Sequence, residues 1–191
     1  MAQMKKILRE YGPMLLLVGV LYFTGWYRPV MGFLQRGVLA TGLFQPSLAL
    51  DDPMPADFDL RWRDAEGNLH SLAEYRGQTI LINVWATWCP PCRAELPDMA
   101  ALYQTEAGQS MKWIMLSQDE ELSKAVDFFE RKEYPWLPVQ AVGSIPAAYQ
   151  SQVVPTTFVI SPQGEIVVRK EGMAQYNTRR FRQFIQELPL N

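Results

Sequence analysis

The chain has 191 residues, of which 48% are hydrophobic, and its 18 basic and 20 acidic residues give a net charge of −2. It contains no repeat and no basic patch of the kind that binds a phosphate backbone, so we expect no nucleic-acid partner. Its two cysteines and its single histidine, His70, cannot supply the set of about four ligands that a zinc site needs.

Residues 1–28 are predicted to form a cytoplasmic N-terminus and a transmembrane anchor. An apolar run from Tyr11 to Tyr27 is near the short limit of about 17 residues for a membrane-spanning helix. Lys5, Lys6 and Arg9 precede it, which places the N-terminus in the cytoplasm by the positive-inside rule. A cleaved signal peptide is the alternative, but no small-x-small cleavage site directly follows the run.

Residues 29–57 are predicted to form a juxtamembrane stalk and linker. The chain stays rather apolar up to Leu50, a pattern that fits either a membrane-surface helix or a packed stalk. An acidic, proline-marked linker follows at Asp51–Pro55. We therefore expect one folded domain over residues 58–191, which is long enough for a single core.

Strand and helix patterns alternate within this domain. Phe58–Trp62 alternates like a half-buried strand, and Thr79–Trp85 has the β-branched and aromatic content of a central strand. A helix is expected from Pro90 to about Ala107, with a kink at Pro97. The next predicted strand is Met111–Leu116.

The second half of the domain is predicted to form a helix, a hairpin and a last helix. Ser117 with Glu120 resembles a capping box at the start of the first helix. Thr156–Ile160 and Glu165–Arg169 flank a turn and are expected to pair as a hairpin. Asn177 is expected to cap the last helix.

The most informative motif is the Trp-Cys-Pro-Pro-Cys run at 88–92, which holds both cysteines. It follows the predicted central strand, where the unpaired N–H groups and the positive dipole end of a helix favour a thiolate over a thiol. We expect Cys89 to be the nucleophile, and Cys92 can close a disulfide with it or resolve a mixed disulfide with a substrate. A covalent haem site would need histidine where Arg93 stands, and an inert structural disulfide is a remaining alternative.

Two motifs make the chain resemble the membrane-anchored thioredoxin-like thiol-disulfide oxidoreductases of the TlpA/ResA type. They are Asn83–Pro97, which contains the cysteines, and Val154–Phe158. The resemblance spans about residues 58–188 and implies an α/β thioredoxin-like fold, with a mixed central sheet flanked by helices and an N-terminal transmembrane helix.

The resemblance also assigns residues to the site. Pro155 matches the family's cis-proline, which lets the backbone of Val154 offer its N–H and C=O groups to an extended substrate peptide. Glu95 matches an acid implicated in proton handling, with a solvated helix-face glutamate as the alternative. Asn83 stands where cytoplasmic thioredoxins carry a buried aspartate. The other expected substrate contacts are Trp88, Pro90 and Pro91.

The implied function is reduction of protein disulfides outside the cytoplasm, by an enzyme of the bacterial inner membrane that requires no bound cofactor. The implied electron donor is a membrane thiol transporter, because a free dithiol in an oxidising compartment needs a supply of electrons. Apocytochrome c is an implied target. The alternatives are a disulfide-donating oxidase of the same fold and a redox-inactive peptide-binding or chaperone module. A peroxidase is disfavoured, since Ala86 stands where its threonine would lie.

Overall fold

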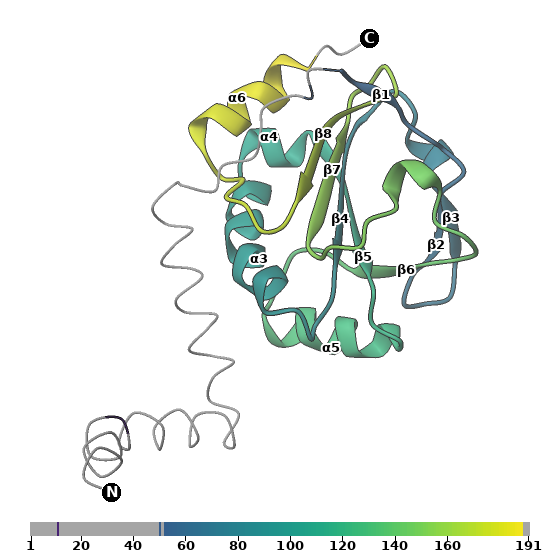
Figure 1. Ribbon diagram of the computed structural model, residues 1–191, viewed down its shortest axis with the longest axis vertical. Coiled ribbons are helices and arrows are strands. Elements are labelled where there is room, and N and C mark those ends of the chain that lie inside the picture. Colours follow the sequence, from purple (N-terminus) through teal and green to yellow (C-terminus); the bar gives the residue numbers. More distant parts are fainter. Residues whose placement is uncertain (1–10, 12–49, 51, 189–191) are drawn as a thin grey trace, which may run out of the picture.

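The computed structural model describes residue 11, residue 50 and residues 52–188. Within these residues the chain forms an eight-stranded sheet with the order β1-β8-β7-β4-β5-β6-β2-β3 (Figure 1). The strands are β1 (Met54–Pro55), β2 (Arg61–Arg63), β3 (Leu69–Ser71), β4 (Thr79–Trp85), β5 (Met111–Ser117), β6 (Pro138–Ala141), β7 (Thr156–Ile160) and β8 (Glu165–Glu171). The helices are α3 (Pro90–Tyr103), α4 (Glu106–Gln109), α5 (Leu122–Arg131) and α6 (Arg179–Glu187), with short 3₁₀ helices η1 (Leu72–Tyr75) and η2 (Ala147–Tyr149).

The predicted membrane anchor lies outside the described residues apart from residue 11, and so does most of the predicted stalk. Among the residues that the structure describes, no helix has the length and hydropathy needed to cross a membrane.

Strand β4 runs through the middle of the sheet, with the predicted bounds, and all seven of its residues are buried. It pairs in parallel with β5, with Trp85 opposite Ser117, and antiparallel with β7, with Asn83 opposite Thr157. Successive side chains of a strand point to opposite faces, so Trp85 joins the core on one face of the sheet and Val84 the core on the other.

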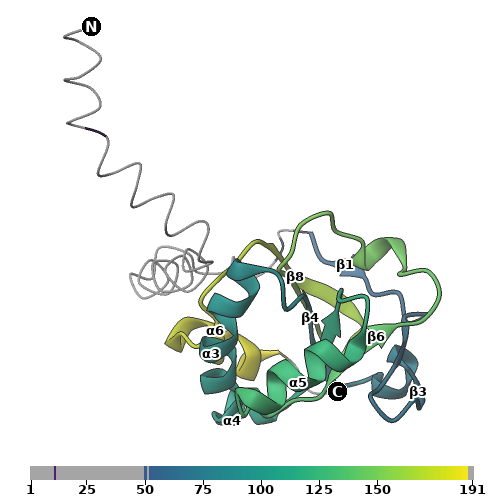
Figure 2. The same ribbon diagram turned by 90° about the horizontal axis from the view of Figure 1, so that it is seen from below.

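The α-helices contribute to the core on one face of the sheet. Trp85 stacks on Phe129 of α5 with ring centroids 4.5 Å apart, and α6 adds Phe181 and Ile185 to the same cluster. Figures 1 and 2 show α3, α4 and α6 grouped on this side. Fully burying one such large apolar side chain is worth about 1.5–3 kcal/mol, so this cluster holds the helices on the sheet.

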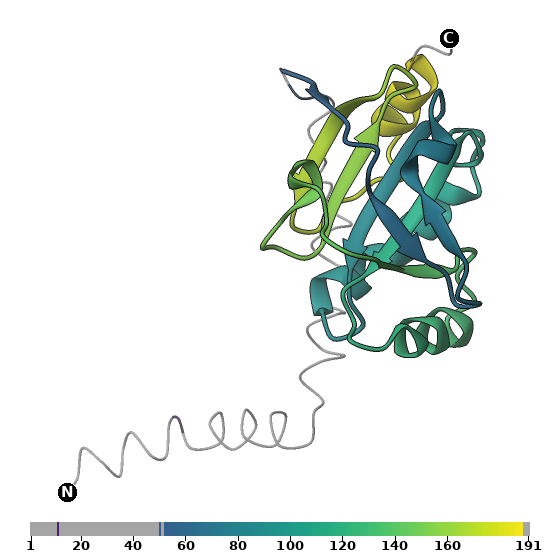
Figure 3. The same ribbon diagram turned by 90° about the vertical axis from the view of Figure 1, so that its right-hand side faces the viewer.

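The opposite face is covered by the first part of the domain and by the 3₁₀ helices. Phe58 and Trp62 pack there with Leu72 of η1 and Tyr149 of η2. Figure 3 turns this β2–β3 side of the molecule toward the viewer. The strand predicted at 58–62 is found slightly later, as β2. The predicted mixed sheet is confirmed, and its α-helices are gathered on one face.

The far edge of the sheet is formed by residues that precede position 58. β1 pairs with β8, and the N–H of Leu50 donates to the carbonyl of Val167 at 2.8 Å. β7 and β8 form the predicted hairpin.

The helix predicted from Pro90 to about Ala107 is divided in two. α3 continues past Pro97 and ends at Tyr103, and the hydroxyl of Thr105 then caps α4 by accepting the N–H of Gly108 at 3.2 Å. A Cβ at Gly108 would collide with the carbonyl oxygen of Leu102, so the close approach of the two helices requires glycine there.

Two predicted helix caps are wrong. Ser117 belongs to β5 and its hydroxyl donates to Asp119, whereas α5 starts after Glu121 with no side-chain cap. The cap of α6 is Thr178, and the Asn177 side chain instead accepts from Arg182. The Ser117 hydroxyl is engaged by the Asp119 side chain, and at α6 the neighbouring Thr178 takes the capping position expected for Asn177.

Candidate active site

The two cysteines are joined by a disulfide at the start of α3. Cys89 is the N-cap residue, and the backbone N–H of Cys92 donates to its Sγ at 3.2 Å. Pro90 and Pro91 occupy the first helical positions, where no intrahelical N–H bond is lost. Both cysteines are buried. In the reduced protein the same N–H group and the helix dipole stabilise a Cys89 thiolate.

The loop before β7 places a backbone carbonyl beside the nucleophile. The Val154–Pro155 peptide bond is cis, as the resemblance implies, and the Val154 carbonyl oxygen lies 3.6 Å from the Sγ of Cys89. A reduced Cys89 thiol can donate to this oxygen, whereas the disulfide has no hydrogen to give. Pro155 is buried and Val154 half-buried, so this strand end forms one wall of the dithiol site.

An exposed apolar surface adjoins the buried dithiol. The side chain of Trp88 is 64% exposed, so it does not serve as packing, and Pro90 and Pro91 are partly exposed. Val153, just before the cis bond, is 43% exposed. Val153 also lines a hollow of about 770 Å³, together with residues 150–152, but neither cysteine lines this hollow. These groups provide a surface on which a peptide can lie.

Glu95 is fully buried, which excludes the solvated helix-face alternative. Its Oε1 accepts from the Nδ2 of Asn83 at 2.8 Å, and its Oε2 accepts from the N–H of Ala174 at 3.2 Å. Burial raises the pKa of Glu95 to about 8, opposed by these two hydrogen bonds; the charge of Asp98 adds to the rise and Lys170 opposes it. A carboxyl group that titrates near neutral pH can both accept and release a proton there.

Asp98 is a further acid on α3 that the sequence analysis does not single out. Its Oδ2 accepts the N–H groups of Tyr176 and Asn177 at 2.6 and 2.9 Å. Burial raises its pKa. The spacing of Glu95 and Asp98, one helical turn apart, is the available signal, and together they attach the loop before α6 to α3.

Asp119 is a second residue that sequence reasoning misses. It is buried just after β5, and its carboxylate accepts the N–H of Thr87 at 3.0 Å, the Thr87 hydroxyl at 2.6 Å and the Ser117 hydroxyl at 2.8 Å. Parallel strands end at the same sheet edge, so an acid after β5 could have been expected near the loop after β4. Asp119 therefore fixes the segment that leads into Cys89.

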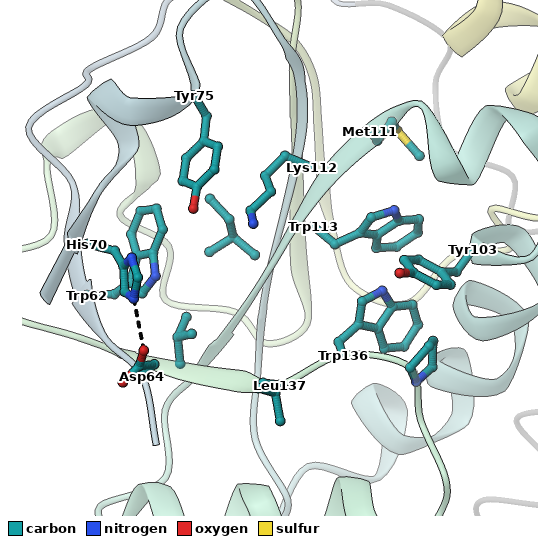
Figure 4. Close-up of a pocket in the computed structure, with 13 residues that line it drawn as sticks. Trp62, Asp64, His70, Tyr75, Tyr103, Met111, Lys112, Trp113, Trp136 and Leu137 are labelled. Carbon is teal, nitrogen blue, oxygen red and sulfur yellow. Dashed lines mark hydrogen bonds and ion pairs between the residues drawn. The ribbon is translucent and has the colours of Figure 1, made fainter. Parts of the chain in front are cut away.

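His70 lies in a different part of the molecule. It stacks on Trp62, which stacks on Tyr75, and these rings line a hollow of about 400 Å³ (Figure 4). The His70 Nε2 is 2.9 Å from the Oδ2 of Asp64, and this hydrogen bond holds the pKa of Asp64 at about 2. Neither cysteine lines this hollow.

Comparison with known proteins agrees with this geometry. The sequence profile of the AhpC/TSA family matches residues 50–169. The thiol-disulfide oxidoreductase ResA of Geobacillus kaustophilus is 29% identical over 136 residues, which are 70% of this chain and 71% of that protein. ResA of Halalkalibacterium halodurans is 32% identical over 125 residues, 64% of this chain and 71% of the relative.

Solved structures share the fold. A putative thiol:disulfide interchange protein DsbE from Chlorobium tepidum superposes with a TM-score of 0.60 at 22% identity, over 72% of this chain and 97% of that one. StoA from Bacillus subtilis superposes with a TM-score of 0.55 at 24% identity, over 68% of this chain and 98% of the StoA chain.

The buried carboxyl group of Glu95 predicts a pH-dependent stability. In the unfolded chain Glu95 ionises near its ordinary value of 4.5, whereas in the folded protein its pKa is about 8. Between these two pKa values the folded state holds more protons than the unfolded chain. The free energy of unfolding therefore falls as the pH rises from 4.5 to about 8, by at most about 1.4 kcal/mol per pH unit. Urea unfolding across this pH range should show this slope reduced in Glu95→Gln.

The control for this titration is Glu130→Gln, at an exposed position of α5. It should keep the wild-type slope. Equal slopes for wild type and Glu95→Gln would contradict the assignment of the buried proton to Glu95.

The contacts between Asp119 and Thr87 predict an energetic coupling. Asp119→Ala removes the acceptor of the part-buried Thr87 N–H group and should cost about 1–3 kcal/mol of stability. Thr87→Val removes only the hydroxyl contact. In a double-mutant cycle measured by urea unfolding, the two changes should couple by at least about 0.5 kcal/mol. Additive effects would show that the contact does not hold this loop.

Proposed function

The chain belongs to the AhpC/TSA family, as a thioredoxin-like thiol-disulfide oxidoreductase of the ResA type, and from this premise we propose that it reduces disulfides of proteins outside the cytoplasm. The observation that carries the proposal is the position of Cys89. It lies at a helix N-terminus, in contact with the carbonyl that precedes a cis-proline and next to the exposed Trp88.

The first step is attack of the Cys89 thiolate on a substrate disulfide. A bond forms between Cys89 Sγ and one substrate sulfur, and the other substrate sulfur leaves as a thiolate. The N–H of Cys92, 3.2 Å from the Cys89 Sγ, stabilises the attacking thiolate. Because that sulfur is buried, the substrate disulfide must reach it from the side of Trp88 and Val154.

The second step is resolution by Cys92. Its sulfur attacks the Cys89 Sγ, the bond to the substrate breaks, and the substrate leaves with both sulfurs reduced while the cysteine pair is oxidised by two electrons. Cys92 must lose its thiol proton for this attack. Glu95 lies one turn further along the same helix, is buried, and has its pKa raised to about 8, so it is the proposed proton acceptor.

The substrate is proposed to bind as an extended segment across the cis-proline loop. The backbone groups of Val154 offer strand-like hydrogen bonds, and Trp88, Pro90, Pro91 and Val153 supply apolar contact. Strand-like recognition through the backbone depends little on substrate sequence, so it suits unfolded or loop segments that carry a disulfide.

The proposed location is the periplasm, or an equivalent extracytoplasmic space, of a bacterium, with residues 1–28 as a single-pass inner-membrane anchor. The apolar run from Tyr11 to Tyr27 and the basic residues before it support this orientation. A membrane thiol transporter is the proposed electron donor, because the compartment is oxidising. Apocytochrome c cysteines that await haem are the proposed targets, on the strength of the TlpA/ResA resemblance.

The two-step mechanism predicts different behaviour for the two cysteines. Reduced Cys92→Ser should form a mixed disulfide with an unfolded protein that carries a disulfide and should fail to release it. Reduced Cys89→Ser should form little adduct and lose turnover, because its remaining sulfur is fully buried. Non-reducing mass spectrometry of the purified protein after mixing checks this. Full activity of Cys89→Ser would instead support a redox-inactive binding module.

A further inference from the structure

Asn83 lies at the centre of a buried polar cluster on the α3 side of β4. Its side chain is completely buried, and its Nδ2 donates to the Oε1 of Glu95 at 2.8 Å and to the Oγ1 of Thr157 at 2.9 Å. The three side chains come from β4, α3 and β7, so this amide connects the strand before the dithiol, the dithiol helix and the strand after the cis-proline.

The amide of Asn83 meets Glu95 with a hydrogen-bond donor. An ionised carboxylate only accepts hydrogen bonds, so a fixed N–H group favours the charged form of Glu95 over the neutral form. The N–H of Ala174 does the same at the other oxygen. Burial without these two donors would disfavour the charge much more strongly.

The other groups around Glu95 act in both directions. On α3 the charge of Asp98 disfavours ionisation of Glu95, and on β8 Lys170 favours it. Tyr176, in the loop before α6, is fully buried near Glu95, and its pKa is raised well above the ordinary value, so it stays neutral. Asn83 is the side-chain donor among these neighbours, and its removal changes no charge.

We propose that Asn83 is a positioning residue for the resolving step, which holds the Glu95 carboxylate in place and keeps its ionised form available to accept the Cys92 proton. This inference rests on the proposed function of Glu95. The Asn83 amide differs in this from the aspartate at the corresponding place in cytoplasmic thioredoxins. The amide does not accept the proton itself, but it orients Glu95, which does, and favours the ionised form of Glu95.

The test follows the two steps separately in the purified full-length protein. The reduced protein is mixed with a chromogenic aryl disulfide, which releases one coloured thiol when Cys89 attacks and a second when Cys92 resolves the adduct. The rate of the second release is measured against pH for wild type, Asn83→Leu, Glu95→Gln and the control Glu130→Gln. Leucine has the same branched skeleton of side-chain heavy atoms as asparagine but no hydrogen-bonding group, and Glu130→Gln removes a carboxyl group at an exposed position of α5.

We expect the curve of second-release rate against pH to have its inflection at a higher pH in Asn83→Leu than in wild type. Release at neutral pH should slow tenfold for every pH unit by which the inflection rises, which corresponds to about 1.4 kcal/mol. The rate of the first release in Asn83→Leu and the rates of both releases in Glu130→Gln should stay close to those of wild type. The titration of the Glu95 carboxyl carbon, followed by NMR, should move in the same direction. If Asn83→Leu does not fold, Asn83→Ala is measured in the same way.

The proposals for Glu95 and for Asn83 are overturned by different results. If Glu95→Gln keeps the wild-type inflection, the proposed function of Glu95 is wrong, and an unchanged NMR titration in the Asn83 variant would also overturn the role of Asn83. If Glu95→Gln loses the inflection but the Asn83 variant keeps it at the wild-type pH, Glu95 is the acceptor and the inference about Asn83 is overturned.

Discussion

The burial of β4 between β5 and β7 is the constraint on which the rest of the site depends. Parallel pairing with β5 brings Asp119 to the end of β4, where it holds Thr87 before the dithiol. Antiparallel pairing with β7 brings the start of that strand to the same end, so that the carbonyl before Pro155 faces Cys89. One strand thus places Cys89, the loop before it and the cis-proline loop together.

Strand β4 also places the polar side chain of Asn83 in the core, beside a buried acid, and burying such groups costs stability. Glu95 is a buried acid held by Asn83 and by the N–H of Ala174, and Asp98 is held by two further N–H groups of the same loop. Removing a carboxyl group from water is unfavourable unless donors replace the water. An apolar residue at position 95 would avoid this cost, but it would remove the carboxyl group that we propose as the acceptor of the Cys92 proton.

Local patterns in the sequence predict β4, the start of α3, the dithiol and the β7–β8 hairpin, because each depends on neighbours in the chain. The resemblance adds the cis bond at Pro155. Local patterns do not predict the roles of Ser117 and Asn177, because their side chains bind Asp119 and Arg182 and do not cap the backbone of a helix. The contact of Asp119 with Thr87 joins residues 32 positions apart, and that of Asn83 with Thr157 spans 74, so neither leaves a local pattern.

The reduction potential of the Cys89–Cys92 pair tests the central claim most directly. The purified protein would be equilibrated with glutathione buffers of graded ratio, and its free thiols would be counted by mass tagging. A reductase supplied with electrons by a membrane donor should have a potential well below the roughly −180 mV of protein disulfide isomerase. A value near the roughly −120 mV of a strong oxidant would show that the protein donates its disulfide and would contradict the proposed direction of electron flow.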